Sequence, residues 1–340
     1  MPDAFAIRNR MLAVITVLFI AAALRASYAV TMPLAASILV ISAIWPVKPW
    51  LDRALPSGVS YAGTVLVLLF LLVSFVAALY FSTAQIVRAF AQNWERFETG
   101  YQSLTQWGDE WGLTVGGKEG YARLIGFGEE VLSNAYTVLV YLGFITLLVV
   151  LGLPQVPALR KKIHEQFEAA NQREVIETVG EIASKVRHYL AITTATSLIT
   201  GFASAFWAFA VGLDLALVWG LLNFLLNYVP IVGNLIGIIP PTIYALVQFQ
   251  SWTIPVIFFV GLSVVQMVIS NVISPMLQGR SLSLPPIVVV VALAFWSWVW
   301  GIAGALIAVP LTVALVIACE HFTSTRWIAI LLSTRPTVKH

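Results

Sequence analysis

The chain has 340 residues, of which 59% are hydrophobic and 10% are charged, and its formal net charge is +3. Soluble domains are usually about 25% charged, so this composition excludes an ordinary soluble domain and indicates a polytopic membrane protein. The single cysteine excludes a disulfide framework and a cysteine metal site, and the basic balance does not indicate nucleic acid, because cytoplasmic loops of membrane proteins collect Lys and Arg.

Six apolar segments are predicted to be helices, and most approach the roughly 20 residues that cross the hydrocarbon layer. The second segment is short, and we expect it to need the support of neighbouring helices to cross the membrane. Counted from a cytoplasmic N-terminus, the first two form a hairpin, the third leads out and the fourth leads back. The segments lie at 11–29, 30–45, 59–83, 134–153, 189–212 and 253–274.

Two polar stretches separate these segments. Residues 84–133 carry four basic and seven acidic side chains and are predicted to lie outside the cell. In residues 155–187, apolar positions recur at mostly three- and four-residue steps, which predicts one or two amphipathic helices. We expect these helices to lie on the membrane surface or on the helix bundle, and a catalytic role is less expected.

The heptad Tyr228–Asn234 separates two apolar runs, 216–228 and 235–249, that are each too short to span. Pro230 lies in this heptad, and proline cannot continue a helix undisturbed because it lacks an N–H and clashes with the preceding turn. The sequence therefore predicts a re-entrant hairpin at 216–249 that enters and leaves on the outer side.

A second pair of short apolar runs, 287–299 and 302–318, is separated around Trp300 and Gly301. We expect a second re-entrant hairpin here, at 287–318, opening on the cytoplasmic side. This topology places both termini in the cytoplasm, with fourteen Lys and Arg inside and five outside, as the positive-inside tendency requires. Two oppositely oriented hairpins are typical of secondary transporters with inverted repeats.

The predicted fold class is all-α, with about six transmembrane helices plus two oppositely oriented re-entrant hairpins. Four regions follow: an N-terminal transmembrane scaffold at 1–153, cytoplasmic amphipathic helices at 154–188, a transport region at 189–320 and a cytoplasmic tail at 321–340.

Three motifs of the C-terminal half resemble the autoinducer-2 (AI-2) exporter family of bacterial membrane transporters, a family of permeases. They are Trp219–Asn234 followed by Ile239-Pro240-Pro241, Asn271–Pro275 followed by Gly279–Leu282 and Pro286, and Trp300–Pro310. Their order and spacing agree with the family over nearly the whole chain.

The resemblance implies a multi-pass protein of the bacterial inner membrane that forms homo-oligomers, among which a pentamer is one form. It implies either export of small quorum-sensing signals such as AI-2 or, as in some relatives, sodium/proton exchange. Many members carry a glutamate at the place that corresponds to Ile269 here, and its absence weakens the case for ion coupling.

Several polar and helix-breaking residues lie in the predicted transport region. Asn223 and Asn227 are four apart, so their amides share one helix face directly before the break. Two interpretations stay open: they contact a neutral polyol or a partly dehydrated cation, or they satisfy backbone groups and join helices. Gly233 and Gly237 allow close helix packing. Asn234 is expected to act at the hairpin tip, where it can also cap the second half-helix, and the two roles are compatible.

The helix at 253–274 supplies a second set of polar residues. Gln266 and Ser270 are four apart, Asn271 lies one step round, and together they are expected to face the hairpins. An interhelical hydrogen bond is the alternative. Arg280 is the only charged residue between 215 and 319, and snorkelling to water is favoured over substrate contact.

Three tryptophans, Trp296, Trp298 and Trp300, alternate around the second break. Interfacial anchoring is the ordinary explanation, and a stacking surface for a small ring is the other. The predicted substrate-binding and pathway residues are Asn223, Asn227, Pro230, Gly233, Asn234, Gln266, Asn271, Pro275, Arg280, Gly301, Gly304 and Pro310.

No Asp or Glu lies between 215 and 319, although proton and sodium exchangers usually bury one. We therefore expect alternating-access export of a small neutral solute such as AI-2, with an elevator-type movement as one form of it. Sodium/proton antiport and a passive channel stay open as alternatives, as does a structural scaffold. No enzyme, metal or cofactor is expected, because the four histidines show no HExxH spacing. The expected partners are the solute, the lipid bilayer and further copies of the chain.

Overall fold

The structure is a computed structural model that describes residues 2–45, 47–93, 126, 135–166, 169–230, 232–249, 251–278, 284–321 and 325–333. Most of the predicted external segment and half of the predicted C-terminal tail therefore lie outside the described residues, and so does Arg280. The described residues form helices joined by turns, with no strand among them, which confirms the all-α class.

Six of the described helical segments are long and apolar enough to cross a membrane. This number agrees with the prediction, but the set differs. The segments 232–249 and 286–321 reach spanning length, while 15–26 and 140–152 count as shorter apolar helices. The six segments are Tyr28–Leu51, Gly58–Gln92, Val175–Val211, Val232–Phe249, Thr253–Leu277 and Pro286–His321.

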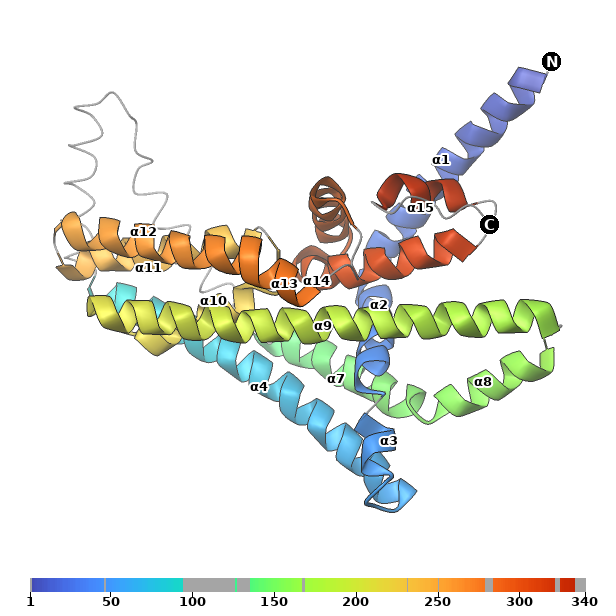
Figure 1. Cartoon of the computed structure of the whole chain (residues 1–340), viewed down its shortest axis with the longest axis horizontal. Helices are drawn as coiled ribbons and strands as arrows, with labels where there is room; N and C mark the ends of the chain where they lie inside the picture. The colour runs from blue at the N-terminus through green and yellow to red at the C-terminus, as the bar shows by residue number, and fades with distance from the viewer. Residues whose placement is uncertain are drawn as a thin grey trace. The chain divides into compact units, whose positions relative to one another are not determined.

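Two helices are longer than a bilayer requires. Helix α4 (Ser57–Gln92) has 36 residues, so the first residues of the predicted external segment continue it. Helix α9 (Ala169–Val211) has 43 residues, about 64 Å at 1.5 Å per residue, and Figure 1 shows it as one rod. The prediction of a separate helix at 189–212 was wrong. The change from polar to apolar composition near residue 188 marks where α9 can enter lipid. It does not mark a boundary between two helices.

The polar stretch 155–187 does contain two helical segments, as expected. Helix α8 (Gln155–Gln166) comes first, and the N-terminal half of α9 is the second. The chain divides into two compact units, each assembled from separate stretches of sequence. Unit 1 comprises 1–65, 141–189 and 280–340, and unit 2 comprises 66–140 and 190–279.

Unit 1 contains α1 (Pro2–Ala26), α2 (Tyr28–Ile44), α3 (Val47–Leu51), α7 (Ala135–Gly152) from Tyr141 onward, α8, α14 (Pro286–His321) and α15 (Arg326–Leu332). It also contains the first parts of α4 and α9, up to residues 65 and 189. Polar side chains join its helices through backbone carbonyls. Tyr61 donates its hydroxyl hydrogen to the carbonyl of Val150, and Arg187 donates to the carbonyl of Ser42 at 3.2 Å.

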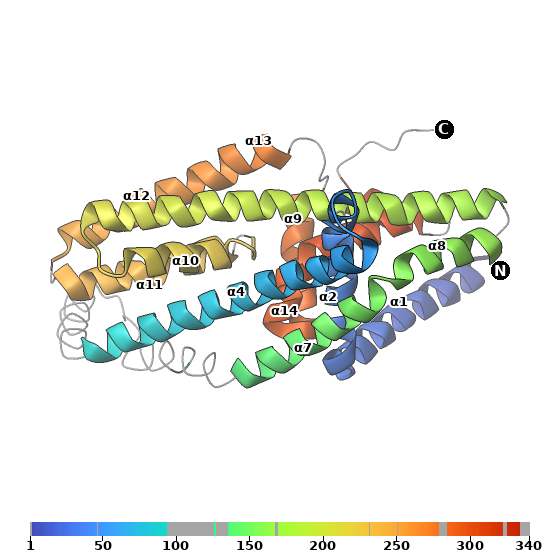
Figure 2. The same ribbon diagram turned by 90° about the horizontal axis from the view of Figure 1, so that it is seen from below.

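Unit 2 contains α10 (Ala216–Leu226), α11 (Val232–Phe249), α12 (Thr253–Val268), the π-helix η1 (Ile269–Ile273) and α13 (Ser274–Gln278), together with parts of α4 and α9. Figures 1 and 2 show α11 running alongside α12. Its core includes Trp219, Tyr244, Phe258 and Leu262, and the rings of Trp219 and Tyr244 lie 5.6 Å apart. This core holds α10, α11 and α12 together.

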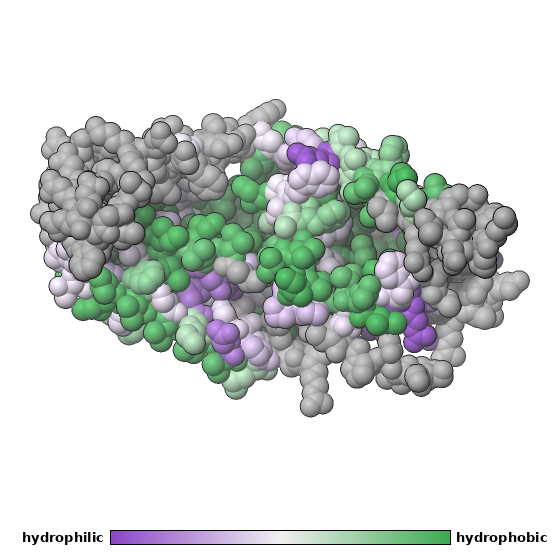
Figure 3. All heavy atoms as spheres, turned by 90° about the horizontal axis from the view of Figure 1, so that it is seen from above, coloured by the Kyte–Doolittle hydropathy of each residue, from purple (hydrophilic) through white to green (hydrophobic). Residues whose placement is uncertain are grey.

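Large apolar side chains are widely exposed on these helices, as contact with lipid requires. On α9, Phe202, Phe206 and Phe209 are each more than 70% exposed. Figure 3 shows broad hydrophobic areas on one face of the molecule. Exposed apolar patches of this extent mark interaction or membrane surfaces.

Candidate functional site

A helical hairpin, α10 and α11, forms the centre of unit 2. Helix α10 ends at Leu226, the turn contains Pro230, and α11 begins at Val232. A Cβ added at Gly233 would lie 1.8 Å from the carbonyl oxygen of Leu226, so only glycine permits this closeness. The first predicted break is therefore confirmed, while its re-entrance stays a prediction. The first arm has 11 residues and is too short to span a bilayer alone.

A buried amide pair attaches the hairpin to α12. Asn223 is 1% exposed and donates to the carbonyls of Trp219 at 3.0 Å and Gly237 at 3.1 Å. Its Oδ1 accepts from Nε2 of Gln266 at 2.8 Å. Gly237 is required here, because an added Cβ would lie 2.3 Å from that Oδ1. Asn223 thus joins three helices at one point.

Asn234 makes a second connection to the same side of the hairpin. Its amide donates to the hydroxyl oxygen of Ser270 at 2.7 Å. The expectation that Asn234 caps α11 was wrong, because α11 begins two residues earlier, at Val232. Gln266 and Ser270 both face the first hairpin, as their four-residue spacing predicts, and they do so through interhelical hydrogen bonds.

Asn227 faces a different helix. It is the C-terminal cap of α10, and its amide donates to the hydroxyl of Ser197 at 2.9 Å and to that of Thr196 at 3.4 Å, both on α9. Asn223 and Asn227 are therefore directed to separate partners despite their spacing.

The sequence interpretation missed a stripe of buried hydroxyl side chains on α9. Its members recur at steps of one, three and four residues, which places them on one helix face. A search for Ser and Thr at helical spacing would have found them. Their small side chains barely change the hydropathy of an apolar segment, so a search for polar interruptions does not detect them. The stripe consists of Thr193, Thr196, Ser197, Thr200 and Ser204.

At the open end of the hairpin, one glutamine side chain connects the end of α11 to the turn before α10. Gln248, at the end of α11, accepts from the backbone N–H of Asp214 at 2.8 Å and donates to the carbonyl of Gly212 at 2.8 Å. The turn it holds contains Leu215 with φ 60° and Gly212 with φ 78°. The strained non-glycine residue is thereby fixed between α9 and α10.

Other predicted site residues do not join this group. Asn271 lies on the π-helix η1, is exposed, and donates to the carbonyl of Met267, four residues earlier at the end of α12, at 2.9 Å. Pro275, on α13, is also exposed. Substrate contact by Asn271 and Pro275 stays a prediction. Their exposed positions, away from the amide contacts of the hairpin, do not favour it.

Gly301, Gly304 and Pro310 belong to unit 1, on α14. This helix is broken at Trp300 and at Gly301, which has φ 62° and ψ −145°. Trp296 Nε1 donates to the hydroxyl of Thr312 at 3.1 Å, although 16 residues of straight helix would separate them by about 24 Å. The second arm therefore folds back on the first. A Cβ added at Gly304 would lie 1.9 Å from the carbonyl oxygen of Trp296.

The tryptophans around this bend correct the interfacial explanation. Trp296 and Trp300 are buried and stack on each other with ring centroids 4.9 Å apart. Trp300 also donates to the hydroxyl of Thr31 at 3.1 Å. Only Trp298 is half exposed, and the guanidinium of Arg25 lies 4.5 Å from the centre of its ring. The bend buries two of the three, which the sequence spacing alone could not show.

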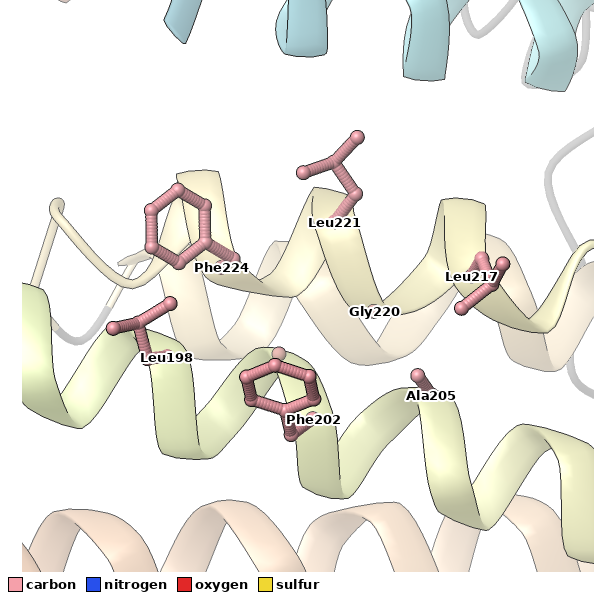
Figure 4. A pocket seen from close by; sticks show the side chains of 8 residues that line it. Leu198, Phe202, Ala205, Leu217, Gly220, Leu221 and Phe224 are labelled. Carbon is pink, nitrogen blue, oxygen red and sulfur yellow. The ribbon is translucent and has the colours of Figure 1, made fainter. Parts of the chain in front are cut away.

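An open apolar groove runs between α9 and α10, with a volume of about 220 Å³. Figure 4 shows Phe202 and Leu198 of α9 facing Phe224 of α10. The groove carries no charged side chain, and its floor is formed where Gly220 approaches Ala205.

The polar contacts of the hairpin in unit 2 are made by amides, hydroxyls and backbone carbonyls. Its second arm and the neighbouring α9 and α12 are long and apolar enough to span a membrane. Among the described residues there is no cluster of His, Cys, Asp and Glu that could hold a metal ion. Such a fold and site define a multi-pass membrane transporter with a polar, uncharged hairpin. The sequence profile of the AI-2E family of transporters matches residues 12–324, and the chain belongs to this family.

Individual relatives are similar over part of their length. The AI-2 transport protein TqsA of Escherichia coli K12 is 36% identical over 204 residues, 59% of this chain and 57% of that protein. A Haemophilus influenzae protein, named only provisionally as a transport protein, is 32% identical over 219 residues, 62% of this chain and 60% of that protein. The aligned part thus spans less than two thirds of these relatives.

Proposed function

We propose that this protein exports a small neutral polar molecule such as AI-2 by alternating access, which can take an elevator form. The observation that carries the proposal is the interrupted hairpin α10–α11, which is attached to α9 and α12 through side-chain amides and hydroxyls. Broken helices at membrane depth are tolerated where protein or a water-filled path satisfies their backbone groups.

Neutral chemistry at the hairpin supports an uncharged solute. Asp214 is the only acidic residue in the described part of unit 2, and it lies exposed in the turn before α10. A proton or sodium exchanger would normally bury a carboxylate among such helices. The described residues of the hairpin include no Asp, Glu, His or Cys, the side chains whose pKa values lie closest to neutral. We therefore expect the transport rate to change little between about pH 6 and 8.

The similarity to TqsA supports AI-2 as the first solute to test, since AI-2 transport is what the name of that protein states. We further propose that the protein lies in the cytoplasmic membrane with both termini inside and works as a homo-oligomer. The excess of basic residues in the predicted cytoplasmic segments supports this orientation.

Efflux from cells tests the proposal. A bacterial strain that makes AI-2 but lacks its own exporter would be given the wild-type chain or an empty vector, and extracellular AI-2 would be followed with time. We expect faster release with the wild-type chain. Equal release in both strains would overturn the proposed function, and release abolished by a proton uncoupler would favour ion-coupled transport.

A further inference from the structure

A proline interrupts the backbone hydrogen bonds of the π-helix η1. The N–H of Ser274 donates to the carbonyl of Ile269, five residues earlier. The next N–H along the chain would belong to residue 275, but Pro275 has none. The carbonyl of Ser270 therefore loses both helical donors, the N–H four residues on and the N–H five residues on. Departures of this kind from the α-helix are frequent at functional sites.

This carbonyl lies inside a segment that is able to cross a membrane. The segment is Thr253–Leu277, and Ser270 lies about 10 Å along the helix axis from its end. Every backbone polar group at such a depth needs a partner, because lipid offers none. The carbonyl of Ser270 thus requires a ligand or water that donates a hydrogen bond.

Two further polar groups lie at the same place. Asn234, on the second arm of the hairpin, donates from Nδ2 to Oγ of Ser270 at 2.7 Å. This bond leaves the hydroxyl hydrogen of Ser270 able to donate and Oδ1 of Asn234 able to accept. Both residues are only partly buried. Oδ1 of Asn234 is not among the enclosed, unpaired side-chain atoms of the described residues, so a ligand can reach it.

We infer that Asn234 and Ser270, together with the carbonyl of Ser270, bind a pair of hydroxyl groups of the solute beside η1. This inference rests on the proposed function for its cargo. The carbonyl and Oδ1 can only accept, whereas the hydroxyl of Ser270 donates. A neutral diol complements this set, because each of its hydroxyls both donates and accepts. Pro275 is a positioning residue: it withholds the N–H that would otherwise occupy the carbonyl.

The surroundings favour a diol over a cation. Carbonyls freed by broken helices also coordinate sodium in transporters. Asp214, however, is the only acidic residue in the described part of unit 2, and it lies exposed at the open end of the hairpin. The pair of Asn223 and Gln266, one turn earlier on the same face of α12, is uncharged as well. A cation beside η1 would lack a counter-charge, which is costly.

Ligand binding to the full-length protein in nanodiscs tests the inference. The probes are AI-2, the neutral polyol erythritol, and the tetramethyl ether of erythritol, which keeps the oxygen acceptors but has no O–H donor. We expect AI-2 and erythritol to bind and the ether not to bind, because two of the three groups of the site only accept. Sodium ions alone are the fourth probe, and we expect no binding.

Pro275→Ala is the most informative variant. It supplies the missing N–H to the carbonyl of Ser270, so the melting temperature should rise while binding of AI-2 and erythritol weakens roughly fivefold, as for one lost hydrogen bond. A merely structural proline would change the melting temperature alone. Ser270→Ala removes the hydroxyl and should also weaken binding about fivefold.

Two control variants match these changes. Ser263 is a partly buried serine seven residues before Ser270 on the same face of α12, so Ser263→Ala should bind like wild-type protein. Pro286 is an exposed proline at the first position of α14, where an N–H has no partner within the helix. Pro286→Ala should therefore change neither binding nor stability.

The inference is overturned if Pro275→Ala and Ser270→Ala bind AI-2 and erythritol like their controls. It is also overturned if wild-type protein binds neither compound, or binds the ether equally well. Sodium binding that Pro275→Ala abolishes would overturn it too, because the site would then hold a cation. Binding that depends on Ser270 and Pro275, without any efflux by wild-type protein, would instead refute the proposed function alone.

Discussion

The side chains of Asn223 and Gln266 meet inside unit 2, where Nε2 of Gln266 donates to Oδ1 of Asn223 at 2.8 Å. Because Asn223 also binds the carbonyl of Gly237, this one pair connects α10, α11 and α12. The hairpin is thereby attached to its neighbour through uncharged groups, which can exchange partners without moving a proton.

Replacing Gln266 with Met tests the pair. The change keeps the side-chain size but leaves Oδ1 of Asn223 buried and unpaired, which costs about 1–3 kcal/mol. We expect a lower midpoint of unfolding for the purified protein. Asn271→Ala is the control, because that amide is exposed and bonds only to the carbonyl of Met267, four residues earlier. Equal stability of the two variants would show that the pair does not hold the hairpin.

Asn227→Ala distinguishes a contact with solute from a structural bond. The change removes the donor to Ser197, whereas Ser197→Ala removes only the acceptor. We expect both variants to lose stability modestly, and AI-2 efflux to fall several-fold in Asn227→Ala alone. The same efflux in both variants would assign Asn227 to helix packing.

Glycine at position 233 is required by close packing. Gly233→Ala would place Cβ 1.8 Å from the carbonyl oxygen of Leu226, so the hairpin turn must open. We expect faster amide hydrogen exchange in residues 225–240 and a lower melting temperature. Gly180→Ala on α9 meets nothing within 4 Å and should be stabilising by up to about 1 kcal/mol. An unchanged exchange rate in Gly233→Ala would contradict the described turn.

Gly301→Ala tests the bend of α14. A φ of 62° with a ψ of −145° is a conformation that side-chain-bearing residues avoid, and forcing it costs on the order of 1–3 kcal/mol. We expect the fluorescence of Trp296 and Trp300 to shift as their stack opens, together with reduced stability. Gly143→Ala, on α7 with no neighbour within 4 Å, is the control. Identical spectra for both variants would argue against the bend.

Local chemistry in the sequence predicted both breaks and the side of α12 that faces the hairpin. Pro230 and the Trp300–Gly301 step interrupt helices for backbone reasons that act within a few residues. The four-residue spacing of Gln266 and Ser270 follows from helix geometry alone.

Features that depend on distant segments could not be predicted in this way. Trp296 and Trp300 are buried because α14 folds back and because Thr31 lies beside the bend. Asn223 binds Gln266 on α12, whereas Asn227 binds Ser197 on α9. The spacing of the two asparagines along α10 does not reveal which helices pack against it. The continuity of α9 was missed because a change in polarity was interpreted as a change in structure.

Counterflow in proteoliposomes tests the central claim, that the uncharged hairpin carries a neutral solute. Liposomes containing the wild-type protein would be loaded with unlabelled AI-2 and placed in a trace of labelled AI-2, without any ion gradient. The account predicts transient accumulation of label above equilibrium, with similar rates at pH 6 and 8. Simple equilibration without overshoot would indicate a channel, and accumulation only with an imposed sodium or proton gradient would contradict the claim.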